Sequence, residues 1–158
     1  MTLHIRQATE ADLPAVLALY AQPGMDDGDV LSPGEARELF AQFARYPNYR
    51  LFVACEGGEA GEGGEVVATY ALLVMHNLAH RGTPSAIAED VVVAPGRQGQ
   101  GIGRQLMAHA IEQARQDGCY KLALSSNSKR TRAHAFYDSL GFQRHGLSFL
   151  IEPCDANL

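Results

Sequence analysis

The chain has 158 residues, 46% hydrophobic and 20% charged, which is the length and composition of one ordinary globular domain and not of a disordered protein. Its longest apolar-dominated run, Val66–Met75, is far shorter than the ~20 residues that cross a bilayer, and residues 1–12 lack the basic and apolar stretches of a signal peptide. A formal net charge of -5 disfavours nucleic acid and anionic membranes as main partners.

The first part of the chain predicts a short strand followed by two helices. Leu3–Gln7 is the strand candidate, and Thr9 with Asp12 three residues later is typical of a capping box. The apolar residues that follow recur at helical spacing, which predicts the first helix. Ser32, followed by proline, begins the second helix, and the loop before it, residues 25–29, is acidic.

Three strands are expected next. Tyr49–Cys55 and Val66–Met75 are rich in β-branched and aromatic residues, and the glycine- and glutamate-rich residues 56–65 between them predict a hairpin loop. Ser85–Ala94 is a valine-rich strand candidate, which Pro95–Gly96 should end.

The last part predicts two helices, Gly103–Asp117 and Lys129–Leu140, each followed by a strand, Tyr120–Leu124 and Phe142–Ile151. Gly141 suits the left-handed position that ends a helix. The order β-α-α-β-β-β-α-β-α-β predicts an α/β protein with a mixed sheet, because hairpins are antiparallel and helical crossovers favour parallel neighbours. We expect one domain over residues 1–158.

The net charge is unevenly distributed along the chain. Residues 1–65 carry eleven acids and four arginines, a balance of -7, whereas residues 97–132 carry seven bases and two acids, a balance of +5. A charge run is more often a solvated face than a site. The basic stretch also holds the most unusual glycine spacing in the chain, so an anionic ligand is expected there.

A glycine-rich turn follows the valine-rich strand. Glycines at 99, 101 and 103 let backbone N–H groups approach a bulky anion, and the helix that follows adds the positive end of its dipole. Arg97 and Arg104 could act as counter-charges. The spacing differs from a dinucleotide fingerprint, and no Gly-Lys-Ser/Thr follows as in a P-loop, so the structural alternative is a tight strand-to-helix turn.

Two motifs resemble those of a known family. Residues 98–103, Q-G-Q-G-I-G, match the Q/R-x-x-G-x-G/A signature of the GNAT N-acetyltransferase superfamily, directly after a valine-rich strand. Asn127, then A-H-A-F-Y at 133–137 and G-F at 141–142, resemble the next helix and strand of that family. The resemblance implies a mixed, mostly antiparallel central sheet flanked by helices.

It also implies acetyl-CoA as co-substrate, with the pantetheine arm between two splayed strands. The resemblance places the expected contacts on the end of the valine-rich strand, the glycine turn and the later motif. These contacts are Val91, Val92, Val93, Arg97, Gln98, Gly99, Gln100, Gly101, Ile102, Gly103, Arg104, Asn127 and Phe136.

Acetyl transfer needs a base for the amine, a donor for the oxyanion and a proton for the thiolate. Glu89 is the predicted base, directly or through water, and Asp90 a substrate contact or an orienting group. In a regular strand the two point to opposite faces, unless a bulge re-aims the chain. A carboxylate held by backbone donors is the alternative for each. Tyr137 is the acid that the resemblance implies, the alternative being a packed aromatic, and an N–H near Val92 would polarise the thioester carbonyl.

The resemblance places residues 75–84 near the acceptor site. His76, Asn77 and Arg81 are therefore expected substrate contacts, with His80 beside them, rather than metal ligands. No metal site is expected. The three scattered cysteines form neither a disulfide framework nor a ligand pattern, which favours the reducing cytoplasm. The acidic loop 25–29 could steer a cationic amine.

The sequence therefore predicts an acetyl-CoA-dependent N-acetyltransferase that acts on the primary amine of a small molecule by direct attack in a ternary complex. The alternative is a non-catalytic acyl-CoA-binding or regulatory module of the same fold. Residues 88–93 look similar to glucosamine phosphate N-acetyltransferases, which suggests an amino sugar phosphate, whereas the acidic first half fits a cationic amine. The acceptor and the oligomeric state, a homodimer included, are left open.

Overall fold

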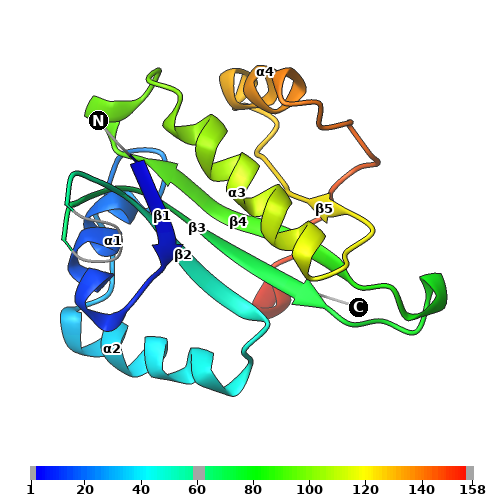
Figure 1. The fold of residues 1–158 in the computed structure, drawn as a ribbon, viewed down its shortest axis with the longest axis horizontal. Coiled ribbons are helices and arrows are strands. Elements are labelled where there is room, and N and C mark those ends of the chain that lie inside the picture. Colours follow the sequence, from blue (N-terminus) through cyan, green and yellow to red (C-terminus); the bar gives the residue numbers. More distant parts are fainter. Residues whose placement is uncertain (1–2, 59–62, 156–158) are drawn as a thin grey trace. The chain divides into compact units, whose positions relative to one another are not determined.

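The computed structural model describes residues 3–58 and 63–155, in two compact units, residues 1–124 and 125–158. The first unit is built on a five-stranded sheet of order β1-β2-β3-β4-β5 (Figure 1). The first four strands are antiparallel neighbours and the last pairs parallel with the fourth, so the expected mixed, mostly antiparallel sheet is confirmed. The strands are β1 (Leu3–Gln7), β2 (Tyr49–Glu56), β3 (Glu65–Met75), β4 (Ser85–Val93) and β5 (Leu122–Ala123).

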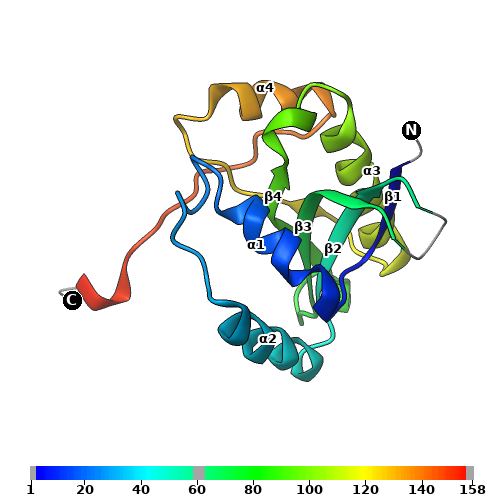
Figure 2. The same cartoon turned by 90° about the vertical axis from the view of Figure 1, so that its left-hand side faces the viewer.

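Helices cover both faces of this sheet. Figure 2 shows α1 (Leu13–Tyr20) and α2 (Pro33–Gln42) on one face and α3 (Ile102–Gln116) on the other. Short 3₁₀ turns join the elements at Glu10–Asp12, Phe43–Arg45, His80–Gly82 and Pro95–Arg97. The sheet therefore has two distinct buried faces, one beneath α1 and α2 and one beneath α3.

The predicted capping box at Thr9 forms, and a second one forms where Ser32 begins α2 as expected. The Thr9 N–H donates to Asp12 Oδ2 at 2.7 Å, and the Ser32 N–H donates to Glu35 Oε2 at 2.9 Å. Asp12 also accepts two hydrogen bonds from Arg6, at 2.7 and 2.8 Å. The Arg6 guanidinium is the main reason that the pKa of Asp12 is lowered to about 2. This pair fixes β1 to the start of α1.

The two faces bury different side chains. Beneath α1 and α2, Val16 packs with Val53 and Ala71 in one apolar cluster. Beneath α3, the Phe52 and Tyr70 rings stack with their centroids 5.1 Å apart. Alternate residues of a strand point to opposite faces, so Val53 and Phe52, neighbours on β2, mark the two sides.

Three expectations need correction or restriction. The last strand, predicted at Phe142–Ile151, is wrong: residues 142–155 contain no strand, and the second unit holds α4 (Thr131–Ser139) and a 3₁₀ turn at Pro153–Asp155. A strand needs a neighbour for its backbone hydrogen bonds, and no strand is described in this unit. β5 is shorter than expected for the same reason, since only two of its residues pair with β4. The predicted hairpin loop lies partly outside the described residues.

Candidate active site

A β-bulge interrupts β4 at its two acidic residues. Ala71 pairs with Glu89 and Thr69 with Val92, so between these pairs two residues of β4 face one residue of β3. Asp90 has a φ of 51°, in the left-handed region that residues other than glycine rarely adopt. A bulge of this kind changes the direction in which the following side chains point.

The strand register shows where Glu89 points. Residues opposite each other in antiparallel strands point to the same face, and Ala71 belongs to the core beneath α1 and α2. Glu89 therefore points to this face. Tyr49 packs against the same core, and the negative charges of both Asp90 and Glu89 help to raise its pKa. Both carboxylates therefore lie near enough to the Tyr49 phenol for their charges to act on it, and the bulge at Asp90 interrupts the regular alternation of the strand.

Two tyrosines beside the bulge carried no signal in the sequence. Tyr20 ends α1, and its phenol lies beside the hydroxyl of Thr69. Burial, then the charge of Asp90, raises the pKa of Tyr20. Tyr49 begins β2, and its pKa is raised by burial and then by Asp90 and Glu89. Both phenols are protonated at neutral pH and can donate hydrogen bonds. The two tyrosines come together only because α1 packs on the sheet, and no pattern of neighbouring residues in the sequence indicates this packing.

Asp26, from the loop after α1, adds a third carboxylate. Its backbone N–H donates to the Tyr20 carbonyl at 3.0 Å, which turns the loop back beside the end of α1. Asp90 reaches the surface, but partial desolvation raises its pKa, and the charges of Glu89 and Asp26 raise it further. We call Tyr20, Asp26, Tyr49, Glu89 and Asp90 the acid–tyrosine cluster.

The glycine turn after β4 has the shape of an anion cradle. Gly99 and Gly101 have φ values of 76° and 82°, and a Cβ at either position would meet no atom within 4 Å. Gly101 is the N-cap of α3 and offers no side-chain cap, so first-turn N–H groups are left for an outside acceptor. Gln98 and Gln100 hold the turn by donating to the carbonyls of Val93 and Gly96, at 3.3 and 3.1 Å. The turn fits a pyrophosphate group.

Arg97 has a structural role beside the turn. Its Nε lies 3.1 Å from Glu56 Oε2 and its Nη2 lies 3.2 Å from Glu65 Oε2, so it joins the turn to the ends of β2 and β3. Arg104, in contrast, is exposed in the first turn of α3. Of the two arginines predicted as counter-charges, Arg104 is therefore the more available, and the contact of Arg97 with the co-substrate stays a prediction.

The predicted acceptor contacts of residues 76–84 do not join the bulge. This loop begins beyond the Met75–Ser85 pair, four residues along β4 from Glu89, or roughly 13 Å at ~3.3 Å per residue. Asn77 closes the loop, since its Nδ2 donates to the Thr83 carbonyl at 2.7 Å. Arg81 has a left-handed φ of 58°, and both His76 and Arg81 stay predictions as substrate contacts.

The second unit contains the later motif. Asn127 Oδ1 accepts from the Lys129 N–H at 2.9 Å just before α4, and its carbonyl lies 2.8 Å from His134 Nε2. The Phe136 and Tyr137 rings, on α4, are 5.2 Å apart between centroids. Gly141, with a φ of 87°, follows the end of α4 as expected. All of these contacts lie within the second unit. The role of Tyr137 stays a prediction.

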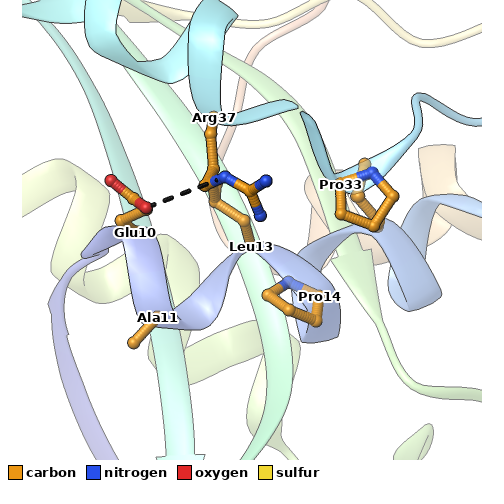
Figure 3. A pocket seen from close by; sticks show the side chains of 7 residues that line it. Glu10, Ala11, Leu13, Pro14, Pro33 and Arg37 are labelled. Carbon is orange, nitrogen blue, oxygen red and sulfur yellow. Dashed lines mark ion pairs between the residues drawn. The ribbon is translucent and has the colours of Figure 1, made fainter. Parts of the chain in front are cut away.

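A groove of about 260 Å³ lies between α1 and the start of α2 (Figure 3). A long ion pair, 4.0 Å between Arg37 Nε and Glu10 Oε1, joins two exposed side chains at its edge. None of the predicted site residues lines the groove, so it is separate from the acid–tyrosine cluster. Its lining residues are Glu10, Ala11, Leu13, Pro14, Leu17, Pro33 and Arg37.

Two classes of site are not found within the described ranges. Residues 3–58 and 63–155 contain no group of three or more His, Cys, Asp or Glu side chains arranged to hold a metal ion. Over the same residues, no helix is both long enough and apolar enough to cross a membrane.

Comparison with known proteins decides the family. The model of the Acetyltransferase (GNAT) family matches residues 13–142. The chain belongs to this family. Aminoalkylphosphonate N-acetyltransferase of Salmonella typhimurium is 37% identical over 147 residues, 92% of this chain and 88% of that protein. Aminoglycoside N(6')-acetyltransferase type 1 of Stenotrophomonas maltophilia is 30% identical over 141 residues, 88% of this chain and 85% of that protein.

Solved structures agree with this assignment. The crystal structure of a Trypanosoma brucei acetyltransferase superposes with a TM-score of 0.80 at 27% identity and covers 96% of this chain and 99% of that one. The expected enzyme class, acetyltransferase, is therefore confirmed. GNAT acetyltransferases use acetyl-CoA, and the binding of its pyrophosphate at the glycine turn stays a prediction.

Proposed function

We propose that this chain transfers the acetyl group of acetyl-CoA to the primary amine of a small molecule by direct attack in a ternary complex, its two units acting as one domain. The observation that carries the proposal is the bulge of β4, which falls at Glu89 and Asp90 just before the glycine turn, where the charges of both carboxylates reach Tyr49. An amine bound there meets a base, two phenols and a negative field next to the co-substrate.

The residues proposed to hold acetyl-CoA follow the bulge directly. The backbone of Val91, Val92 and Val93 would line the pantetheine arm, and the first-turn N–H groups of α3 would meet the pyrophosphate. Arg104 would supply the counter-charge. Asn127 and Phe136 are proposed contacts of the arm from the second unit. The co-substrate itself supplies an activated thioester.

Each proposed chemical role belongs to one group of the chain. Glu89 takes the proton of the ammonium group, directly or through water, and leaves a neutral amine. The amine nitrogen forms a bond to the acetyl carbonyl carbon, the carbon–sulfur bond breaks, and the nitrogen loses its extra proton to solvent, from which Tyr137 is later reprotonated. A backbone N–H near Val92 polarises the carbonyl oxygen, and Tyr137 gives its proton to the leaving thiolate. Asp90 orients the amine.

The names of the relatives support an amine acceptor. They include aminoalkylphosphonate and aminoglycoside acetyltransferases, so the shared feature of the named acceptors is an amino group on a small molecule. His76, Asn77 and Arg81 are proposed as outer contacts of a longer acceptor. We place the enzyme in the cytoplasm, because Cys55, Cys119 and Cys154 are free thiols.

Two measurements test the proposal. Coenzyme A should raise the melting temperature of the purified chain, because a ligand that binds only the folded state stabilises it. Free thiol should then be released from acetyl-CoA in the presence of a suitable amine, and mass spectrometry should show the acetylated amine. Absence of stabilisation by CoA would refute the proposal. Stabilisation without acetylation of any amine in a broad panel would instead favour the non-catalytic acyl-CoA-binding module.

A further inference from the structure

The acid–tyrosine cluster holds more carboxylates than acetyl transfer uses. One base is enough to deprotonate the attacking amine, and Glu89 fills that role. Asp90 and Asp26 remain beside it, and their mutual repulsion with Glu89 is a cost in the free protein. Groups kept in an unfavourable state next to a reacting centre are candidates for contacts with a ligand.

No base balances these acids on the elements that supply them. α1, the loop 21–32 and β4, all described by the structure, contain five acids and no Lys, Arg or His. β2 contributes one base, Arg50, but it lies over the Phe52 ring at 5.7 Å and is hydrogen-bonded to Gln113 and Asp117 on the α3 side. The elements that supply the cluster therefore bring acids and no free base to it, and Arg6 of β1, which points to the same face, is paired with Asp12.

Aromatic rings add a second feature that suits a cation. The Tyr49 ring meets Phe43 edge to face, with centroids 4.9 Å apart, and lies 6.4 Å from the Tyr46 ring. Tyr20 packs against the same core from α1. The faces of aromatic rings attract ammonium groups, and phenol oxygens can accept hydrogen bonds from them. Acids and aromatic rings together make a surface for an organic cation.

We propose that the acceptor carries at least one positive charge besides the reacting amine, as a diamine, polyamine or multiply aminated sugar does, and no phosphate or phosphonate group. This inference rests on the proposed acetyl transfer and names its substrate class. Asp26 and Asp90 bind the second cation while Glu89 deprotonates the first amine. A phosphonate in the same place would face Asp26, Asp90 and Glu89 with no base opposite, and like charges brought together at a binding site cost several kcal/mol.

Three acceptors of one chain length test the proposal: 1,5-diaminopentane, pentylamine and 5-aminopentylphosphonate. The chain keeps the terminal group far enough from the reacting amine that the pKa of this amine changes little along the series. We expect kcat/KM for the diamine to exceed that for pentylamine about tenfold, or ~1.4 kcal/mol, and the phosphonate to rank last. Added salt should shrink both differences, because it screens exposed charges.

Two variants in the loop 21–32 test whether Asp26 causes the preference for the diamine. Asp26→Asn should lower the ratio of diamine to pentylamine kcat/KM about threefold, whereas Asp29→Asn, the same charge change three residues on, should leave the ratio as it is. A phosphonate acetylated as well as the diamine would overturn this inference and leave acetyl transfer intact. If none of the three, nor any other amine, is acetylated, the proposed function fails and the inference falls with it.

Discussion

Two groups of polar side chains, one on each face of the sheet, differ in whether they are paired within the chain. Beneath α3, the Tyr70 hydroxyl and His109 Nδ1 are 2.7 Å apart, and Arg50 binds Gln113 and Asp117. Beneath α1, Glu89 and Asp90 stand with Asp26 and without a base. These polar groups of the α3 face hold a helix to the sheet, whereas the acids of the acid–tyrosine cluster on the α1 face are left for a partner from outside the chain.

This contrast has a thermodynamic side. The part-buried hydrogen bonds beneath α3, Tyr70 to His109 and Arg50 to Gln113, each contribute about 1 kcal/mol to folding, and removing one partner costs more where the other is left unsatisfied. The acids of the acid–tyrosine cluster repel one another, and a bound cation would relieve that repulsion. Substitutions on the α3 face should therefore change stability, and substitutions on the α1 face should change activity.

Glu89→Gln should have the largest effect and tests the α1 side of the contrast. Removal of a general base should lower kcat/KM about 100- to 10,000-fold at neutral pH, while the melting temperature stays the same because no protein partner is lost. Steady-state rates and thermal unfolding of the same preparation measure both. Glu38→Gln, an exposed carboxylate on α2, is the control. An unchanged rate with an unchanged pH profile would exclude Glu89 as the base.

A pair of glycines at the two ends of α3 separates backbone strain from co-substrate binding. Gly101 and Gly118 have φ values of 82° and 72°, and both have open space where a Cβ would lie. Alanine at either position should cost about 1 to 2 kcal/mol of stability. Only Gly101→Ala should also raise the KM for acetyl-CoA, about tenfold, because its methyl group enters the proposed pyrophosphate cradle. Equal KM values in the two variants would contradict that cradle.

Features defined by neighbours in the chain could be predicted from the sequence. The capping boxes at Thr9 and Ser32 and the end of α4 before Gly141 depend on short-range hydrogen bonds and on backbone freedom. The bulge could be named as an alternative, because adjacent acids inside a strand are hard to satisfy otherwise. Phe142–Ile151 has the composition of a strand, but a strand also requires a partner, which composition does not report.

The same limit applies to the candidate site: residues close together in the sequence could be predicted, and residues brought together by packing could not. Glu89, Asp90 and the glycine turn lie within 15 residues of one another and could be found together in the sequence. Tyr20 and Tyr49 could not, since each is an ordinary aromatic residue at the edge of an element. Their place beside the bulge depends on how α1 packs across β3, and on Thr69 being opposite Val92. The pairing of Arg97 with Glu56 and Glu65 is hidden for the same reason.

The smallest effect is expected from His109 and tests the α3 side of the contrast. Burial, followed by the positive charge of Arg50, lowers the pKa of His109, so the unfolded chain binds a proton there more readily than the folded chain. The resulting stability is present above the unfolded pKa of about 6.5 and is lost as pH falls through that value toward the lower folded pKa. Between about pH 8 and pH 5 the free energy of unfolding should therefore fall more in the natural protein than in His109→Gln.

His145→Gln is the control, because this histidine is exposed. Asp12, with a pKa of about 2, titrates well below the range of the measurement and does not contribute to the difference. Tyr70→Phe removes the partner of His109 and should lower stability by about 1 to 3 kcal/mol without changing kcat. If His109→Gln instead altered the pH profile of kcat and left the unfolding curves unchanged, the α3 face would also take part in catalysis, and pairing within the chain would no longer distinguish the two faces.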